Sequence, residues 1–396
     1  MKKAMLAVRG LERGPRSGAS GFLRIAVLCC LCVLCAVATS AQQPGTAGVE
    51  DNAKHTFTTF DAPGVDLVPG QGTVPSSINT AGVIAGGYNP TGGVVSPSGF
   101  VRAADGTITE FIPRGTLVYA AYPVAINAAG TITGYYLGYT TQPQQGGYVL
   151  AHCFVRTADG TFTTVDAPGA GTGAYPEGQG TTCTGINAAG VIAGSYVDAN
   201  GLGHGFARTA GGTMISFDPP GSAGTAPLGI SDAGVIAGFY ADASGVYHGF
   251  VRAARGAITS FDAPGAGTTG PFAGTQARSI NTAGTIAGYY LDASNVYHGF
   301  ARAAGGAITT FDAPGAGTLS TEGTWALSIN TAGAIVGWYF NSKGSHGFVR
   351  APSGALTTFN APGAAGGTRA QSISKGAIAG YYYDATNAVH GFLLTP

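Results

Sequence analysis

The sequence predicts an all-β fold, a seven-bladed β-propeller with four antiparallel strands in each blade. Three observations carry this prediction. One unit of sequence recurs seven times, and each copy contains four short segments with the residue alternation of β-strands. The repeat region begins with the fourth segment of a unit and ends with the third segment of a unit. The 3.6-residue period of an amphipathic helix is absent from the copies, which argues against a helical repeat.

Three short markers define the repeat, and each occurs seven times. An Ile-Asn or Ile-Ser pair begins at Ile78, Ile126, Ile186, Ile230, Ile280, Ile329 and Ile373. A Phe, mostly preceded by Gly, stands at Phe100, Phe154, Phe206, Phe250, Phe300, Phe348 and Phe392. The aromatic residue or Val before "DAPG" or its variant falls at Phe60, Phe111, Val165, Phe217, Phe261, Phe311 and Phe359. The Phe markers are 44–54 residues apart, a spacing close to that of propeller blades.

The fifth copy shows the four expected strands. "ARSIN" ends at Asn281 and the turn "TAG" follows; "TIAGYYLD" then alternates β-branched, small and aromatic residues. A short polar loop leads to "HGFAR", and a Gly-containing turn leads to "AITTFD". Four short strands joined by turns are typical of a propeller blade. A β-solenoid is the alternative, but four hairpin-linked antiparallel strands do not make a solenoid rung.

The order of the markers predicts how the ring closes. The repeat region, residues 55–396, begins with a fourth strand, "HTFTTFDAPG", and ends with a third strand, "HGFLLTP". We therefore expect the N-terminal strand to complete the last blade, which removes exposed sheet edges.

The first 54 residues have the composition of a targeting segment and a linker. Six basic residues precede the apolar run "IAVLCCLCVLCAV", and "ATSAQQ" follows it. This pattern predicts a secretory signal over residues 1–41, a short linker over residues 42–54, and an extracellular or periplasmic protein. An uncleaved anchor is the alternative, although the apolar run is shorter than the about 20 residues that span a membrane.

The charge of the mature chain argues against nucleic acid as a partner. The whole chain has 19 basic and 19 acidic residues; removing residues 1–41 takes six basic residues and one acidic residue, which leaves 13 and 18, a net charge of −5. No basic cluster remains. We expect a monomer without a cofactor or a membrane span after signal removal.

The segment "SINTAGTIAGYYLDASNVYHGFAR" resembles the extracellular repeat of the HAF type. Units of that family carry an "IN..G.(V/I).G" segment followed by His, a small residue and Phe. Here the small residue is mostly Gly, and once it is Cys153. The resemblance covers residues 55–396 and implies a secreted bacterial β-propeller, without implying an activity.

A His at the start of each third strand is expected to pair with an Asp at the end of the fourth strand, because the two ends meet across an antiparallel hairpin. The spacing of 14 residues gives the pairs His152–Asp166, His204–Asp218, His248–Asp262 and His298–Asp312. Ring closure gives His390–Asp61, His346 faces Asn360, and Ser98 and Ile112 replace both members in the first blade. Histidines spread around a ring cannot meet at one metal ion, so we expect no metal site there.

Other repeated polar residues have simple structural interpretations. The Arg two residues after each Phe marker is expected at a solvated strand end, and "DAPG" predicts a type II turn. The loops with Asp198, Asp242, Asp292 and Asp384 offer one carboxylate each; an Asx-turn explains them as well as a sugar or calcium site does.

Loop length varies on one face of the predicted propeller, and binding residues concentrate on loops held by a rigid scaffold. This face carries Tyr119, Tyr139, Tyr148, Tyr175 and Trp325; of these, Tyr139, Tyr148, Tyr175 and Trp325, together with Glu177, are the ligand-binding candidates. The two longest loops, after Tyr136 and after Val165, are expected to form one raised rim. The alternative is that the aromatic residues only pack the loops.

Three functions are compatible with this sequence. The first is a secreted binding module for a glycan or a protein. The second is a lyase or glycosidase with its site in the central depression, for which Glu177 and Glu322 are acids on the appropriate face, although no motif pairs them and no catalytic residue can be named. The third is a structural component of the envelope or matrix.

Cys153 and Cys183 are the two cysteines outside the expected signal. Export permits a disulfide between them, which would tie the two longest loops together. Two separate buried thiols are the alternative.

Overall fold

The computed structural model describes residues 56–91, 97–113, 118–140, 149–173, 178–270 and 272–396. Every regular element in these ranges is a β-strand, which confirms the all-β prediction. Accordingly, the described part of the chain contains no helix that is long and apolar enough to cross a membrane. The expected signal (1–41), the expected linker (42–54) and His55 lie outside the described residues.

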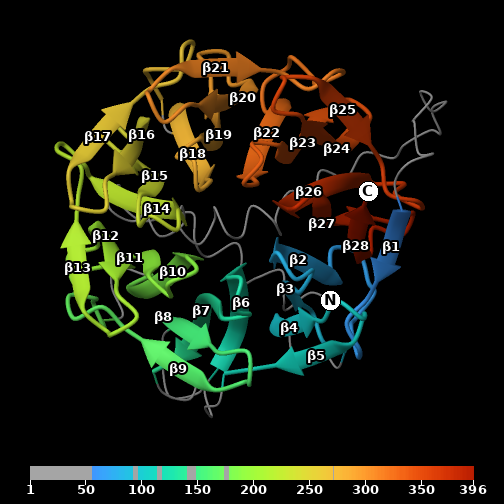
Figure 1. The fold of residues 1–396 in the computed structure, drawn as a ribbon, viewed down its shortest axis with the longest axis horizontal. Helices are drawn as coiled ribbons and strands as arrows, with labels where there is room; N and C mark the ends of the chain where they lie inside the picture. The colour runs from blue at the N-terminus through green and yellow to red at the C-terminus, as the bar shows by residue number, and fades with distance from the viewer. Residues whose placement is uncertain (1–55, 92–96, 114–117, 141–148, 174–177, 271) are drawn as a thin grey trace, which may run out of the picture.

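The strands form groups of four, here called units, which lie around a common centre (Figure 1). Each unit takes the name of its inner strand. The inner strands are β2 (Thr73–Ile78), β6 (Val118–Ile126), β10 (Gly180–Ile186), β14 (Gly224–Ile230), β18 (Gly274–Ile280), β22 (Gly323–Ile329) and β26 (Gly367–Ser374). The second strands are β3 (Ile84–Tyr88), β7 (Ile132–Tyr139), β11 (Ile192–Val197), β15 (Ile236–Ala241), β19 (Ile286–Leu291), β23 (Ile335–Asn341) and β27 (Ala377–Tyr383).

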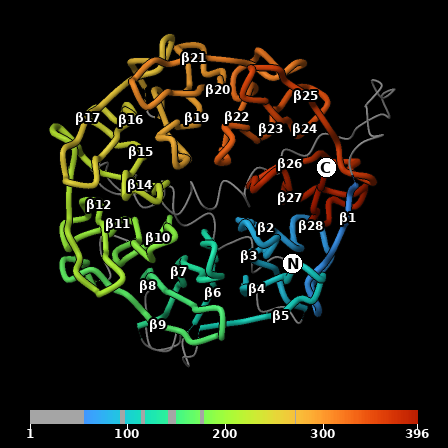
Figure 2. The backbone as a smooth tube through the Cα atoms, in the orientation of Figure 1, coloured from blue at the N-terminus to red at the C-terminus, as the bar shows by residue number. Residues whose placement is uncertain are grey.

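The third and fourth strands complete each unit and lie farther from the centre. The third strands are β4 (Ser98–Arg102), β8 (Val149–Arg156), β12 (Gly203–Arg208), β16 (Tyr247–Arg252), β20 (Tyr297–Arg302), β24 (Gly344–Arg350) and β28 (Val389–Thr395). The fourth strands are β5 (Ile108–Phe111), β9 (Phe162–Val165), β13 (Met214–Phe217), β17 (Ile258–Phe261), β21 (Ile308–Phe311), β25 (Leu356–Phe359) and β1 (Thr56–Phe60). β1 pairs antiparallel with β28, with Thr56 opposite Thr395, so the two ends of the described chain lie side by side (Figure 2).

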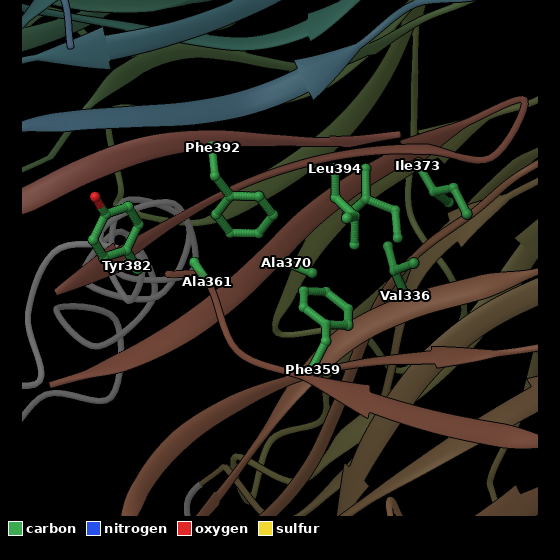
Figure 3. Close-up of a cluster of buried hydrophobic side chains, with 9 residues drawn as sticks. Val336, Phe359, Ala361, Ala370, Ile373, Tyr382, Phe392 and Leu394 are labelled. Carbon is green, nitrogen blue, oxygen red and sulfur yellow. The ribbon is translucent and has the colours of Figure 1, made fainter. Parts of the chain in front are cut away.

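The hydrophobic core lies in the seams between neighbouring units. In the seam shown in Figure 3, Val336 from β23 packs with Phe359, Ala370 and Ile373, and with Phe392 from the unit that β26 begins. The Phe of each third strand is fully buried, and it fits because a Gly of the second strand leaves room beside it: a Cβ on Gly86 would lie 2.7 Å from the Phe100 ring. The repeated Gly and Phe are therefore a packing pair.

The repeated Asn of the inner-strand end binds its own turn and the next unit. Asn79 Oδ1 accepts hydrogen bonds from the N–H groups of Ala81 and Val83, which closes the predicted turn, and its Nδ2 donates to the carbonyl of Asn127 at 3.0 Å. Asn127, Asn187 and Asn281 donate in the same way to the following unit. A second set of seam contacts uses serine: Ser372 Oγ accepts from the N–H of Ile78, which joins the β26 and β2 units.

The predicted type II turn is confirmed after β1, β13, β17, β21 and β25, whose turn glycines have a positive φ, whereas Gly169 after β9 does not. Gly64 has a φ of 64°, and the N–H of Val65 donates to the carbonyl of Ala62, as in a type II turn with Pro63 and Gly64 at its centre. A buried threonine of the next inner strand holds this turn in place, because Thr73 Oγ1 accepts from the N–H of Ala62.

The repeated Arg does not mark a solvated strand end, and that expectation is wrong. Arg102 and Arg252 are each 7% exposed, and their guanidinium groups stack on Phe60 and Phe217 of the preceding units, at 4.9 and 4.7 Å. Arg156, Arg302 and Arg350 make the same contact. Burial lowers the pKa of Arg252, but a guanidinium stays charged, so these residues act as cation–π contacts between units.

Candidate functional site

Comparison of the repeats with one another separates scaffold from variable positions. The pattern of the inner strand begins with Gly-Thr in six units and with Ala120-Ala121 in the β6 unit, and it reaches the same Ile in all of them. Four residues after the initial Gly the side chain differs almost everywhere. The residues at this position are Ser76, Val124, Thr184, Leu228, Arg278, Leu327 and Gln371.

A β-bulge explains why this position can vary. In β18, Ala277 pairs with Gly288 and Ser279 pairs with Ala287, so Arg278 between them is the extra residue of the bulge. The same register shift occurs in the other inner strands. A bulge turns the extra residue out of the sheet pattern and redirects its side chain, a device often found beside binding sites. Here it presents one side chain from each unit to the centre.

These bulge residues line a cavity of about 300 Å³ at the centre of the molecule. Tyr122, Tyr88 and Asn89 line it as well, so hydroxyl and amide groups surround the space together with Val124, Leu228 and Leu327. Arg278 is the one charged side chain among the described residues that line it. Its guanidinium lies 5.8 Å from the centre of the Tyr289 ring.

Isoleucines at the ends of the inner strands form the floor of this cavity. Ile230 and Ile280 also line a second cavity of about 170 Å³, which lies among the Asn and Thr turns of the opposite face. These isoleucine side chains therefore lie between the two cavities. A ligand in the first cavity would rest on an apolar floor with polar groups around it.

The structure brings the expected His and Asp residues together. Nδ1 of His152 lies 2.9 Å from Asp166, and the corresponding distances for His204–Asp218, His248–Asp262 and His298–Asp312 are 2.7, 3.0 and 2.9 Å. His390 Nδ1 donates to Asp61 at 2.9 Å across 329 residues of sequence. His346 pairs with Asn360 Oδ1 at 2.9 Å.

Sequence reasoning missed a second carboxylate beside several of these histidines. Asp292 accepts hydrogen bonds from the N–H groups of Ser294 and Val296, as an Asx-turn does, and its other oxygen faces Nε2 of His298 at 3.4 Å. Asp384 faces His390 at 3.4 Å, and Asp198 and Asp242 face His204 and His248 at 3.6 Å. The signal was present, since an Asp lies six residues before each of these four histidines.

The paired carboxylates raise the pKa values of two histidines. The hydrogen bond to Asp312 raises the pKa of His298 against the opposing effect of burial, and Asp292 acts in the same direction. Burial alone lowers the pKa of His390, but the hydrogen bond and charge of Asp61, with a further contribution from Asp384, raise it above its ordinary value. A Tyr ring lies beside each histidine, such as Tyr382 at 5.2 Å from His390.

The unit without the histidine replaces the pair by a different polar group. Ser98 is buried beside Tyr88, and Ile112 is exposed. Burial, together with the hydrogen bond that the Tyr88 hydroxyl donates to the Glu110 carboxylate, raises the pKa of Tyr88 to about 12. Tyr88 also lines the central cavity. The same residue therefore lies beside both Ser98 on the third strand and the cavity.

The aromatic candidates on the loop-bearing face pack against other rings. Trp325 lies within β22, on the inner strand rather than in a loop, with the rings of Tyr297 and Trp338 at 4.3 and 4.1 Å. Tyr139 meets Tyr119 edge-on at 5.6 Å. Both aromatic side chains are therefore engaged in packing, which favours the packing interpretation of these residues.

Several further candidates have limited or structural roles. Tyr148, Tyr175 and Glu177 lie outside the described residues, as do the centres of the two longest loops and hence the expected rim. Glu322 is 9% exposed and accepts a hydrogen bond from the N–H of Leu319, so it braces its own loop. Within the described ranges, no group of three or more His, Cys, Asp or Glu residues is arranged to hold a metal ion.

Cys153 and Cys183 form a disulfide, with Cα atoms 5.2 Å apart. The two cysteines lie inside β8 and β10 and are fully buried, so the bond joins two strands of neighbouring units rather than two loops. The third strand comes close enough because β8 and β10 make a parallel contact at Ala151 and Gly180. The bond crosses the seam between the β6 and β10 units.

Comparison with known proteins finds structural similarities at low sequence identity. No family model matches the chain, and no curated protein matches its sequence. A puromycin hydrolase structure is 13% identical with a TM-score of 0.50, over 78% of this chain and 50% of that one. TolB from Acinetobacter baumannii is 11% identical with a TM-score of 0.44, over 75% and 65%. Aleuria aurantia lectin, a six-bladed β-propeller, is 12% identical with a TM-score of 0.37, over 60% and 77%.

These similarities concern the fold alone. The chain spans half of the puromycin hydrolase and 65% of TolB. The arrangement of four-stranded antiparallel units around a common centre places the protein in the β-propeller class.

Proposed function

We propose that residues 55–396 form a closed, seven-bladed propeller of the HAF-repeat type that is secreted and binds a glycan in its central cavity. The pairing of β1 with β28 and the contact between Ser372 and Ile78 support closure. The basic and apolar N-terminal segment supports secretion.

One observation carries the binding proposal: the bulge position varies between units while the residues around it repeat. Packing alone would favour the same solution in every unit of a near-symmetric ring. Ser76, Leu228, Arg278 and Gln371 instead give each sector of the cavity its own chemistry. Different groups converging on one concave space are the usual arrangement of a ligand site.

A glycan fits the chemistry of the lining. Hydroxyl and amide groups of Ser76, Asn89, Tyr122 and Gln371 can exchange hydrogen bonds with sugar hydroxyls, while Leu327 offers an apolar contact. The volume of about 300 Å³ is at the lower end of the range for small-molecule sites. No Asp or Glu among the described residues lines the cavity, whereas glycoside hydrolysis commonly uses two carboxylates about 5–10 Å apart. This favours binding over hydrolysis.

A glycan array of the mature protein, followed by calorimetry on the best ligand, tests the proposal. The double variant Ser76→Ala/Gln371→Ala removes two polar groups of the cavity and is expected to weaken binding at least tenfold. Thr309→Ala, on the exposed outer strand β21, is the matched control and should bind like the parent protein. Equal binding by both variants would place the ligand elsewhere, and release of free sugar would support an enzyme instead.

A further inference from the structure

We propose that the central cavity is closed at its inner end and receives the end of a glycan chain, so that the protein recognises a terminal sugar and not the sugars inside a chain. This inference rests on the proposed glycan site and names the class of glycan. The cavity has polar groups in its walls, and the isoleucine floor separates it from the second cavity on the opposite face.

The isoleucine floor closes the cavity toward the opposite face. Each of the seven inner strands contributes an isoleucine at or next to its last residue, and six of these seven are at most 9% exposed. Side chains along an open, water-filled passage would be exposed, so these isoleucines are packed together with their surroundings. A chain that enters the central cavity therefore ends at the floor.

Hydrogen bonds between units hold the floor in position. In four units the N–H of the isoleucine donates to the Oγ of a serine in the neighbouring unit at 3.2–3.4 Å; these pairs are Ile78–Ser372, Ile126–Ser77, Ile329–Ser279 and Ile373–Ser328. The turns beside the floor are also tied between units, as by Asn281 Nδ2, which donates to the carbonyl of Asn330 at 3.1 Å. Because a movement of the floor would break contacts of several units together, the fold fixes the depth of the cavity.

The entrance lies on the face that carries the variable loops. Asn89 and Pro97 line the cavity, and they flank the loop that joins β3 to β4 on that face. The volume of about 300 Å³ suits about one or two sugar rings and not a longer segment. A terminal sugar can rest its C–H groups on the isoleucines while its hydroxyl groups meet Ser76 and Gln371, and the rest of the chain leaves through the entrance. A sugar inside a chain needs room on both sides, which the floor denies.

An array of linear oligosaccharides that presents each common sugar both at the chain end and inside the chain tests this inference. The mature protein should bind only the oligosaccharides that present the recognised sugar at an end. Calorimetry then compares the best-binding oligosaccharide with two extended forms, each carrying one further sugar at one of its ends. Extension at one end should weaken binding at least tenfold, because the floor leaves no room, and extension at the other end should change the affinity by less than about twofold.

Ile230→Ala removes floor atoms between the two cavities and should recover at least threefold of the affinity that the unfavourable extension loses. Ile258→Ala is the matched control. Ile258 on the outer strand β17 packs against the same buried cluster around Phe250 as Ile230 does, but it is not among the described residues that line either cavity. It should keep the full loss, and thermal unfolding should show that both variants are folded. If Ile230→Ala does not fold, the two extended oligosaccharides decide on the parent protein alone.

Three results would overturn the inference and leave the glycan proposal standing. The first is equal binding of the best oligosaccharide and both extended forms, and the second is an equal loss in Ile230→Ala and Ile258→Ala. The third is a loss on extension at both ends, since the ligand would then be a short sugar enclosed on all sides. If no saccharide of any kind binds, the inference and the glycan proposal both fail.

Discussion

The inner strand and the outer hairpin of each unit use repetition in different ways. The outer hairpin places a His and an Asp in nearly the same geometry in five units, with distances of 2.7–3.0 Å. The inner strand repeats its Thr in six units and its Ile and its bulge in every unit, but changes the bulge side chain from one unit to the next. The outer hairpin holds a unit together, whereas the inner strand both joins units and displays a variable group to the centre.

This difference indicates which contacts contribute most to the stability of the ring. Contacts at the inner strand and in the seams are buried, and changes there should be costly. The outer His–Asp pairs are partly exposed, with Asp262 and Asp312 side chains about half exposed, and changes there should be mild. Four variants test this gradient.

Gly274→Val should have the largest effect. Gly274 has a φ of 104° and begins β18 where this strand touches Tyr247 of the preceding unit. A Cβ there would overlap the Tyr247 carbonyl oxygen, and a β-branched residue cannot adopt this backbone without strain. We expect the free energy of unfolding, measured by urea denaturation, to fall by more than about 4 kcal/mol, or the variant not to fold.

Gly305→Val is the matched glycine control. Gly305 lies in an outer turn, has no neighbour within 4 Å of a built Cβ, and is not in the left-handed region. Gly305→Val should lower the free energy of unfolding by less than about 1 kcal/mol. Similar losses for the two variants would contradict the distinction between seam and outer turn.

Removing the disulfide should have the second largest effect. The double variant Cys153→Ala/Cys183→Ala opens a bond between residues 30 apart, and the chain-entropy model gives a loss of about 3.5 kcal/mol. Denaturant unfolding with and without a reducing agent measures it. The reductant should lower the stability of the parent protein and leave that of the variant unchanged. If the stability of the parent protein does not change with the reductant, the bond is absent.

Asn281→Ala should have an intermediate effect. Asn281 Oδ1 accepts from the N–H of Thr285, and its Nδ2 donates to the carbonyl of Asn330 in the next unit at 3.1 Å. Removal leaves buried backbone groups without these partners, and we expect the free energy of unfolding to fall by about 2 kcal/mol. Asn281→Ser imitates Ser231 of the β14 unit and should recover part of the loss. No difference between Ala and Ser would show that the turn contact has little value.

The sequence predicted the repeated elements well because their patterns are local. Alternation, turn residues and the constant spacing of His298 and Asp312 each depend on a few neighbouring residues. The bulge was not predicted, because it adds one residue to a strand without any special residue type, and "ARS" around Arg278 looks like ordinary alternation. The central cavity and the Arg–Phe contacts between units depend on how units pack, which local pattern cannot show. For Asp292 the sequence left an Asx-turn and a sugar or calcium site open, and the contact of its second oxygen with His298 follows only from the three-dimensional structure.

The smallest expected effect concerns the pH dependence of the outer pairs, and His390 gives the clearest case because it joins β28 to the segment that follows β1. Its pKa is raised in the folded protein, mainly through Asp61 after β1 and Asp384 in the preceding loop. A raised pKa means that the folded state binds a proton more tightly than the unfolded state. The resulting stability is present below the unfolded value of about 6.5 and is lost as the pH rises through the folded pKa.

His390→Gln should therefore lower the free energy of unfolding by less than about 1 kcal/mol, and only at low pH. Asp61→Asn keeps an acceptor for His390 but removes the charge, so it should weaken the same pH dependence without breaking the contact. Unfolding measured from pH 5.5 to 8.5 should show the parent curve falling toward the curve of His390→Gln as the pH rises. A difference between the two proteins that grows with pH instead would mean that His390 is neutral in the fold and that the carboxylates do not share a proton with it.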